Sequence, residues 1–590
     1  MAADTLAKVL YIDLRRKTSE RRPRPELFEP GLGGAQAAIR LLEEECPQGT
    51  DPLSPENPAI LAVGPLTGLF PLASKTVAMF KSPLTGDLGE SHAGGRSAVA
   101  IRHAGVGAIV IQGASDLPVY LVIDGAKVHF RDASAIWGMH RQSTSGSIIR
   151  ARESGSGLRT IMRIGRAGER LVRYASVTTE TYRHFGRMGL GAVWGSKKLK
   201  AILVTGRASI PVADKQRFQE VYDEIHRAAV QSELMKKYHD LGTAVNVSHL
   251  QQMGGLPAKN LLEQRYAGAE ALFGERLAES YLGRRLACAH CPVACIHIAA
   301  LRQLYEQEPY FYKTSMISYD YELLYALGTM LGVTDTEAYL RLTDAVEAQG
   351  LDAMSTGVVL AWATEALAKG LISTNETADV ELKWGDCEAY ARAVSLIVDQ
   401  PNEFYTVLAR GVRAAAEKYG GEDFALAFNR LEMAGYHTGS GAYANYITGA
   451  RHSHLDSAGY SLDQKALKPG EHTPEKMAEA LLKEEQWRQV LASLVVCFFA
   501  RGIYQPDVVI RALSVAGHEL TEADLDGLGR RILAAKHRFK EREGFRWDAY
   551  ELPKRILEAP APAGPVSETE LRQTVEAFAR MAGEAGRLTT

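Results

Sequence analysis

The chain of 590 residues exceeds the roughly 250 to 300 residues at which a single hydrophobic core stops growing, so two or three domains are expected. Hydrophobic residues make up 46% and charged residues 23%, which excludes disordered, collagen-like and coiled-coil chains. Lys and Arg number 68 against 70 for Asp and Glu, and the formal net charge of -2 predicts no nucleic-acid partner.

The apolar runs are short. Leu494 to Ala500 is among the longest and falls well below the roughly 20 residues that a membrane-spanning helix needs. The first residues, MAADTLAKVLYIDLRRK, lack the apolar core and the small-residue cleavage site of a secretory signal. These features predict a cytoplasmic protein without a membrane span.

Short β-branched runs and frequent glycines fill the first third of the chain and predict a β-rich N-terminal domain over residues 1–208. Asp124-Gly125 is typical of a hairpin turn. Strands are expected at Lys8 to Asp13, Ala59 to Val63, Ala108 to Gln112, Val119 to Ile123, Lys127 to Phe130 and Ala201 to Thr205.

After Pro211 the apolar residues recur at helical spacing, as in Leu340 to Ala348 and Val359 to Ala368. The pair Gly420-Gly421 interrupts this period. We therefore expect two mainly α-helical domains, over residues 209–420 and 421–590, and an α+β fold class. Near the end of the chain, an extended connector over residues 560–565 precedes a final helix that begins at a capping box of Ser567 and Glu570.

Three cysteines crowd into the run Cys288-Ala-His-Cys291-Pro-Val-Ala-Cys295. Three thiolates on one tight loop can supply three of the four ligands of an iron-sulfur cube. Cys497 is the best candidate for the fourth ligand because it lies in an apolar run, whereas Cys46 and Cys387 lie in polar segments. The alternative is a structural zinc site with His290 or His297, since zinc accepts mixed Cys and His ligands. Spacing alone leaves both open.

Glycine-rich turns in the N-terminal domain indicate a large anionic ligand. Glycine lets backbone N–H groups approach phosphate, and arginine binds phosphate with a planar fork. The turns therefore predict a phosphate-bearing cofactor. They are Gly31 to Gly34, Gly64 to Gly68, Lys81 to Gly86, His92 to Arg96 and Arg183 to Gly191.

Together these runs resemble the aldehyde ferredoxin oxidoreductase family, whose members carry a tungsten bis-pterin cofactor beside a 4Fe-4S cluster. The match covers the N-terminal runs from about residue 8 to 206, the loop Cys288 to Cys295, and Cys497. The resemblance favours the iron-sulfur cluster over zinc. It implies a β-rich base domain that holds a tungsten or molybdenum bis-pterin, one 4Fe-4S cluster and Mg²⁺ bridging the pterin phosphates.

The resemblance also implies the cofactor-binding residues. Lys75 takes the place of a family arginine, and His92 stands where the family commonly has asparagine. The first of two short pterin-binding motifs reads Glu347-Ala-Gln-Gly-Leu-Asp352, whereas the second, Ala492 to Cys497, has lost its carboxylate at Ala492. The full expected set is Lys75, His92, Gly94, Arg183, His184, Gly186, Arg187, Glu347, Leu351, Asp352 and Arg451.

The catalytic residues are expected in two runs. A family glutamate near the metal is matched to the run Glu308 to Thr314, so that Tyr312 or Lys313 replaces the carboxylate. The active-site histidine is matched to His454, with His452 as the alternative.

The function that the resemblance implies is oxidation of an aldehyde to a carboxylic acid, with electrons passed through the cluster to ferredoxin or a ferredoxin-like iron-sulfur subunit. The missing carboxylate keeps open a second hypothesis, a tungsten reductase of the same superfamily acting on aromatic acyl-CoA. A third is an electron-transfer or scaffold subunit with a vestigial metal site. A homo- or hetero-oligomer is left open.

Overall fold

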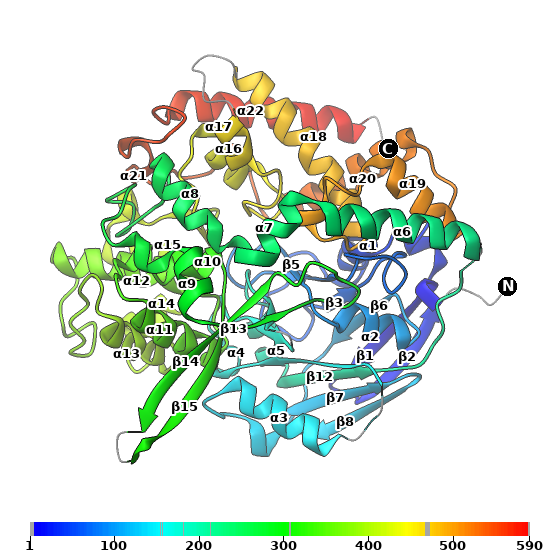
Figure 1. Cartoon of the computed structure of the whole chain (residues 1–590), viewed down its shortest axis with the longest axis horizontal. Helices are drawn as coiled ribbons and strands as arrows, with labels where there is room; N and C mark the ends of the chain where they lie inside the picture. The colour runs from blue at the N-terminus through cyan, green and yellow to red at the C-terminus, as the bar shows by residue number, and fades with distance from the viewer. Residues whose placement is uncertain are drawn as a thin grey trace.

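A computed structural model describes residues 5–153, 155, 157–180, 182–212, 214–305, 308–465 and 473–587. The β-rich N-terminal third, blue and cyan in Figure 1, forms a base that helices from the rest of the chain cover. The α+β class with a β-rich N-terminal region is confirmed. The helices are α1 Gly34–Glu45, α2 Ser97–His103, α3 Gln142–Arg152, α4 Arg166–Glu169, α5 Leu190–Ser196, α6 Lys215–Gln231, α7 Glu233–Leu241, α8 Val245–Met253, α9 Gly274–Ser280, α10 Tyr321–Ala326, α11 Thr336–Gln349, α12 Ala353–Ala368, α13 Cys387–Asp399, α14 Glu403–Leu408, α15 Val412–Tyr419, α16 Ser440–Thr448, α17 Gly459–Lys465, α18 Pro474–Ser493, α19 Pro506–Val515, α20 Glu522–Arg542, α21 Arg555–Glu558 and α22 Glu568–Arg587.

Two six-stranded mixed sheets make up the base. The first has the order β2-β1-β6-β3-β4-β5 and the second the order β11-β10-β9-β12-β7-β8. Every residue of β3 and β4 is buried, as expected of strands covered on both faces. The bounds are β1 Lys8–Asp13, β2 Thr18–Pro23, β3 Ala59–Ala62, β4 Thr76–Lys81, β5 Leu88–Ala93, β6 Ala108–Gln112, β7 Val119–Asp124, β8 Lys127–Asp132, β9 Arg159–Ile164, β10 Val177–Thr179, β11 Arg183–Phe185 and β12 Leu199–Thr205.

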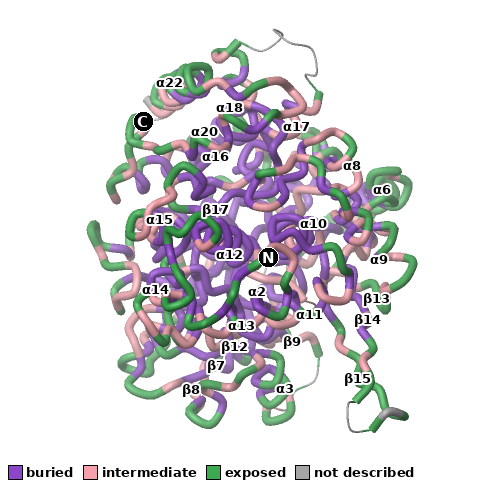
Figure 2. The backbone as a smooth tube through the Cα atoms, turned by 90° about the vertical axis from the view of Figure 1, so that its left-hand side faces the viewer, coloured by how far each residue is buried: buried purple, intermediate pink, exposed green. Residues whose placement is uncertain are grey.

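A third sheet interrupts the helical part of the chain and was not expected. Its order is β13-β14-β15, with β13 Leu282–Leu286, β14 Ile296–Tyr305 and β15 Glu308–Tyr319. The pairing of β13 ends at Ala299, so the described residues 300–305 and 308–316 form a two-stranded arm. Figure 2 shows the exposed end of this arm projecting from the body. A short ladder, β16 Ala427–Phe428 with β17 Leu431–Glu432, completes the strands.

The final helix forms as the sequence predicts. Ser567 Oγ accepts a hydrogen bond from the backbone N–H of Glu570 at 3.3 Å. Leu571, Val575 and Phe578 are buried, and α22 packs against α18 and α20. This C-terminal helix therefore packs on the surface formed by α18 and α20.

The larger of the two hydrophobic clusters that the described residues form runs from β1 to α22 and includes side chains from all three expected domains, and a smaller one packs between the second sheet and α3. The division at residues 208 and 420 stays a prediction. Within the described ranges, no helix is both long enough and apolar enough to cross a membrane.

Candidate functional site

Two neighbouring cavities lie where the base meets the helices. The first, here called the cysteine cavity, has a volume of about 290 Å³, and the second, the Glu347 cavity, about 210 Å³. Both are lined by strand ends of the base and by the starts of helices, so residues far apart in the chain meet there. The residues that line both cavities are Lys75, His92, Arg183, Gly186, Arg187, Asp320, Glu322 and Met354.

All four predicted cysteine ligands line the cysteine cavity: Cys288, Cys291, Cys295 and Cys497. Burial and the neighbouring thiols raise the pKa of Cys291 to about 12 and that of Cys295 to about 11. Four thiolates at such close quarters repel one another and need a compensating positive charge. The thiol set therefore fits a metal cluster.

A zinc site with a histidine ligand does not fit. His297 is engaged at both ring nitrogens, because Nδ1 lies 3.2 Å from the carbonyl oxygen of Cys295 and Nε2 lies 3.0 Å from that of His239. His290 is exposed, outside the cavity lining. Among the described residues, no group of three or more Cys, His, Asp or Glu is arranged to hold a metal ion.

Gly94 directly follows strand β5 and lies against the cysteine loop. A Cβ atom at this position would lie 2.7 Å from Cys288 Sγ and 3.5 Å from Lys75 Nζ. The backbone N–H of Ala289 donates to the carbonyl oxygen of Gly95 at 2.8 Å and holds the contact. Only glycine permits this approach, which explains the glycine in the turn that starts at His92.

Arg187 presents an unused donor to both cavities. Its Nε donates to Asp352 at 3.3 Å and its Nη2 to the carbonyl oxygen of Glu432 at 2.6 Å. Its Nη1 is buried and has no partner among the described residues. An unpaired buried donor is costly, so this atom fits the anionic oxygen of a bound group. Arg183 adds a second cation, with Nη1 3.8 Å from Asp320.

The predicted first pterin motif forms one wall of the Glu347 cavity. Glu347 Oε2 pairs with His184 Nε2 at 2.7 Å, and this charge interaction lowers the pKa of Glu347 although burial opposes it. Asp352 caps α12 through the backbone N–H of Met354. Gly94 and Leu351 complete the predicted residues in this lining.

A buried chain of polar contacts extends from His92 through Glu90 to Lys536. His92 Nε2 lies 2.7 Å from Glu90 Oε1, and Glu90 Oε2 lies 2.5 Å from Lys536 Nζ. Burial lowers the pKa of His92 to about 4, so the imidazole is neutral near pH 7. Burial would raise the pKa of Glu90, but Lys536 and His92 outweigh it and lower that pKa. Glu90 is therefore an ionised carboxylate in the cavity wall.

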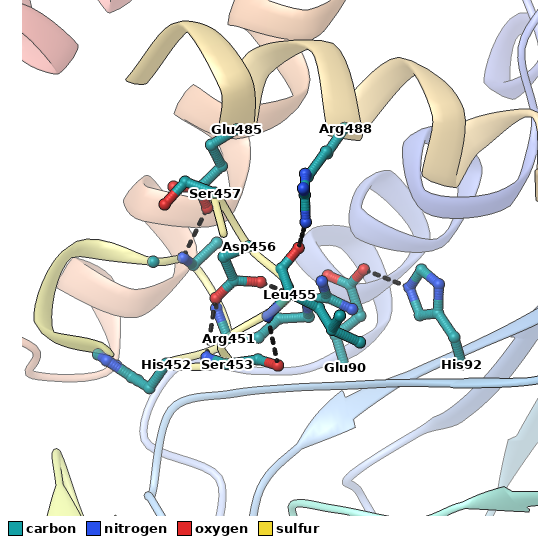
Figure 3. Close-up of polar contacts among 12 residues, drawn as sticks. Glu90, His92, Arg451, His452, Ser453, Leu455, Asp456, Ser457, Glu485 and Arg488 are labelled. Carbon is teal, nitrogen blue, oxygen red and sulfur yellow. Dashed lines mark hydrogen bonds and ion pairs between the residues drawn. The ribbon is translucent and has the colours of Figure 1, made fainter. Parts of the chain in front are cut away.

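The loop over residues 449–457 carries Arg451 and His454 and is held from two sides (Figure 3). Asp456 accepts from Arg451 Nε at 2.6 Å and from the backbone N–H of Arg451 and Ser453, both at 3.0 Å. From α18, Glu485 accepts from the N–H of Ala450 at 2.8 Å and Arg488 donates to the carbonyl oxygen of Leu455 at 2.7 Å. These bonds fix the loop at the cavity rim.

His454 and Glu322 pair inside the cysteine cavity, with His454 Nε2 3.3 Å from Glu322 Oε1. A carboxylate at Nε2 favours the tautomer that carries its proton there. Nδ1 is buried without a partner among the described residues, and it is then the acceptor. Burial and the charge of Glu322 raise the pKa of the adjacent Asp320 to about 6.

Three predicted catalytic residues lie elsewhere and are corrections. Tyr312 and Lys313 are on the arm, where Tyr312 is 53% exposed, and they line neither the cysteine cavity nor the Glu347 cavity. His452 is buried, with Nδ1 2.8 Å from the carbonyl oxygen of Tyr446 and Nε2 2.8 Å from Asn429. Both of its nitrogens are occupied, so it holds the loop rather than facing the cavity.

The expectation that the site has lost its carboxylate is also wrong. Glu322 supplies one beside His454, at the start of α10. In the sequence this carboxylate is marked by the acid-tyrosine-acid run Asp320-Tyr321-Glu322. Ala492 is buried and outside the lining of both cavities, and Glu90 is a further carboxylate in the wall that was missed.

Comparison with known proteins decides the family. A model described as "Aldehyde ferredoxin oxidoreductase, N-terminal domain" matches residues 9–206, and one described as "Aldehyde ferredoxin oxidoreductase, domains 2 & 3" matches residues 220–584. The chain belongs to the aldehyde ferredoxin oxidoreductase family. The predicted resemblance is therefore confirmed over nearly the whole sequence.

Relatives of this family member include tungsten-containing aldehyde ferredoxin oxidoreductases. The protein of that name from Pyrococcus furiosus is 34% identical over 92% of this chain and 89% of its own length, and that from Thermococcus kodakarensis 32% over the same shares. Among solved structures, the active site complex BamBC of benzoyl coenzyme A reductase, in complex with 1,5 dienoyl-CoA, matches with a TM-score of 0.81. The match covers 98% of this chain and 94% of the BamBC chain at 21% sequence identity, and it shows that the two share a fold.

Proposed function

We propose that this protein is a tungsten-dependent oxidoreductase that oxidises an aldehyde to a carboxylic acid and passes the electrons to ferredoxin or a ferredoxin-like iron-sulfur subunit. The observation that carries the proposal is the meeting of four thiols, two arginines and the His454–Glu322 pair around adjoining cavities. Relatives that are 30 to 34% identical bear the corresponding name or that of an aliphatic sulfonate oxidoreductase subunit.

The residues present fit the cofactors of the family. We assign one 4Fe-4S cluster to the four cysteines and a bis-pterin with tungsten or molybdenum to the cationic and glycine positions. Mg²⁺ between the pterin phosphates belongs to the same proposal. When bound, the pterin-held metal supplies two-electron exchange with the substrate and the cluster supplies single-electron transfer. The pterin-binding residues are Lys75, His92, Gly94, Arg183, His184, Gly186, Arg187, Glu347, Leu351, Asp352 and Arg451.

Side chains of the protein accept the proton that leaves the attacking water. Oxidation of an aldehyde adds one water oxygen and releases two protons and two electrons. His454 Nδ1 is placed to accept a proton from the attacking water, and Glu322 stabilises the imidazolium that results. Met354, Leu431 and Leu455 line the same cavity and exclude bulk water, which strengthens this ion pair.

The observation that favoured the reductase hypothesis does not hold in the structure. It depended on a missing carboxylate, and Glu322 is present beside His454. A vestigial scaffold is disfavoured because the buried Nη1 of Arg187 and Nδ1 of His454 lie at the cavities without a partner among the described residues, as expected of a site that binds a ligand. The cytoplasmic location and the oligomeric state stay predictions.

Anaerobic purification with analysis of tungsten, molybdenum, iron and pterin tests the proposal, followed by assays with a viologen dye. We expect about four irons per chain and dye reduction with aldehydes. Aromatic acyl-CoA consumption without aldehyde oxidation would favour the reductase. Absence of both tungsten and molybdenum from active protein would refute the cofactor assignment.

A further inference from the structure

A third cavity of about 480 Å³, here called the Arg163 cavity, opens between α3, β9, α11 and the root of the arm. It touches the Glu347 cavity at a single residue, because Glu347 lines both. Gln142 Nε2 donates to the carbonyl oxygen of Glu347 at 2.6 Å and to Glu347 Oε1 at 3.2 Å, whereas His184 pairs with Glu347 Oε2. The Arg163 cavity is thus separated from the proposed pterin site by the Glu347–His184 pair and plays no part in the proposed reaction.

The lining is rich in cations and hydroxyl groups. Arg141 is neutralised by a bidentate pair with Asp344, at 2.6 and 2.9 Å, and Arg150 pairs with Glu180 at 3.2 Å. Arg163 and Lys313 make no ion pair with a described residue, although the carboxylates of Glu347 and Glu180 lie near enough to act on the charge of Arg163. The hydroxyl groups of the lining belong to Ser143, Ser147, Thr178, Thr179, Tyr182, Thr314 and Ser315.

Arg163 is built into the wall. Its Nε donates to the carbonyl oxygen of Gln142 at 2.9 Å, which leaves the two terminal nitrogens of the guanidinium for another group. The guanidinium packs on Gly146 of α3, where a Cβ atom would lie 3.0 Å from Nε and 3.2 Å from Cζ. Burial lowers the pKa of Arg163, although the nearby charges of Glu347 and Glu180 oppose this shift. A bound anion would relieve the cost of this burial.

Two other polar groups lack partners. Thr178 and Gln142 are each 1% exposed and line the cavity. Thr178 Oγ1 and Gln142 Oε1 make no hydrogen bond to a described residue. The hydroxyl can donate to an anionic oxygen, whereas the amide oxygen can only accept, from a hydroxyl or amine. The cavity thus calls for a ligand that carries both an anion and a donor.

We propose that the Arg163 cavity binds a small organic phosphate of nucleotide or sugar-phosphate size, with its phosphate on Arg163 and Thr178 and a hydroxyl or amino group on Gln142. The volume falls in the range of about 300 to 1,000 Å³ that is usual for small-molecule sites. The site lies outside the proposed catalytic cavities, so its occupancy is measured by binding and does not depend on the proposed activity.

Titration calorimetry on the purified full-length protein tests the proposal with AMP, ribose 5-phosphate, inorganic phosphate and adenosine. We expect binding of at least one of the two organic phosphates, weaker binding of inorganic phosphate and none of adenosine. Arg163→Gln should weaken binding at least about tenfold. The control Arg152→Gln changes an exposed arginine of α3 outside the lining and should leave binding unchanged.

Two conservative variants separate a binding role from a structural one. Thr178→Val removes a buried hydroxyl that bonds to no described residue, so the thermal midpoint without ligand should stay equal or rise while the ligand-induced shift falls. Gly146→Ala favours helix α3 but displaces Arg163, and it too should weaken binding without loss of stability. The proposal is overturned by no binding of either organic phosphate at about 10 mM, by inorganic phosphate binding as tightly, or by Arg163→Gln binding like wild type.

Discussion

The two ends of strand β15 lie in opposite environments. Its first half stands on the arm, where Tyr310 is 90% exposed, whereas Ile317 and Tyr319 are buried and lead directly to Asp320 and Glu322 in the cysteine cavity. A strand from Tyr312 to Tyr319 spans about 23 Å, enough to separate solvent from the site. Similar aromatic and charged residues therefore have different roles according to their distance from the body.

The largest effect is expected at the fourth cysteine. Cys497→Ala should reduce the iron content from about four per chain to about three or fewer, because a cube needs its fourth ligand or a substitute. The control is Cys46→Ala, which removes a buried thiol outside the cavities. Iron analysis and absorption spectra decide the matter, and full iron in the Cys497 variant would show that the ligand is assigned wrongly.

The next effect concerns the proton acceptor in the cavity. His454→Gln should lower kcat about 10²- to 10⁴-fold, the usual worth of general base catalysis. Glu322→Gln should lower kcat less, because the imidazole remains. Steady-state kinetics on both variants check this. His452→Gln serves as comparison and should lower the thermal midpoint more than kcat, since His452 bonds within its own loop. Equal kcat in the His454 variant and wild type would contradict the assignment.

Cofactor retention tests the proposed pterin site in the β-rich N-terminal region. Arg187→Gln should cost on the order of 2 to 5 kcal/mol of cofactor binding, because a desolvated cation that faces an anion is removed. Pterin and tungsten content after dialysis is the measurement. Arg217→Gln, on the exposed face of α6, provides the control. Unchanged content in the Arg187 variant would make this arginine purely structural.

A pH-dependent effect is expected at Glu485, behind the histidine loop. Burial and the charge of Asp456 raise the pKa of Glu485 to about 8. A raised carboxyl pKa destabilises the folded state progressively as pH rises from the ordinary value near 4.5 to about 8. Glu485→Gln should therefore gain stability over wild type with rising pH, reaching on the order of 2 to 4 kcal/mol at alkaline pH. Denaturant unfolding at several pH values measures this gain. A difference that does not change with pH would refute it.

The smallest effect is expected on the arm. Tyr312→Ser and Lys313→Ala should change kcat less than about twofold and stability by less than about 0.5 kcal/mol, because both side chains stand outside the catalytic cavities. Kinetics and thermal unfolding of the two variants provide the measurement. A large loss of kcat in either would mean that the arm reaches the cavity during turnover.

The features that could be predicted from the sequence are those whose residues lie close together in the chain. The cysteine loop and the run Arg183 to Gly191 each occupy one short segment, so their patterns survive without knowledge of the fold. All the predicted cofactor residues line the two cavities. The early strands, such as Lys8 to Asp13, agree with β1 because they are apolar and buried on both faces.

Where the fold brings distant segments together, sequence reasoning failed. Ile296 and Ile298 alternate with other residues in β14, but this short signal lay in a region of helical periodicity. With the arm unrecognised, the run from Glu308 was matched to the catalytic glutamate, and the pattern at Glu322 was passed over. His452 and His454 are two residues apart, and only the hydrogen bonds of the folded loop distinguish them.

Gly94 has no functional group, yet its position tolerates no other amino acid without movement. Every substitution begins with a Cβ atom, and here that atom would meet Cys288 Sγ at 2.7 Å. The amino acids tolerated at position 94 are therefore limited by the short distance to Cys288 Sγ and not by the chemistry of the new side chain. A variant library of this protein should find residue 94 as restricted as the cysteine beside it.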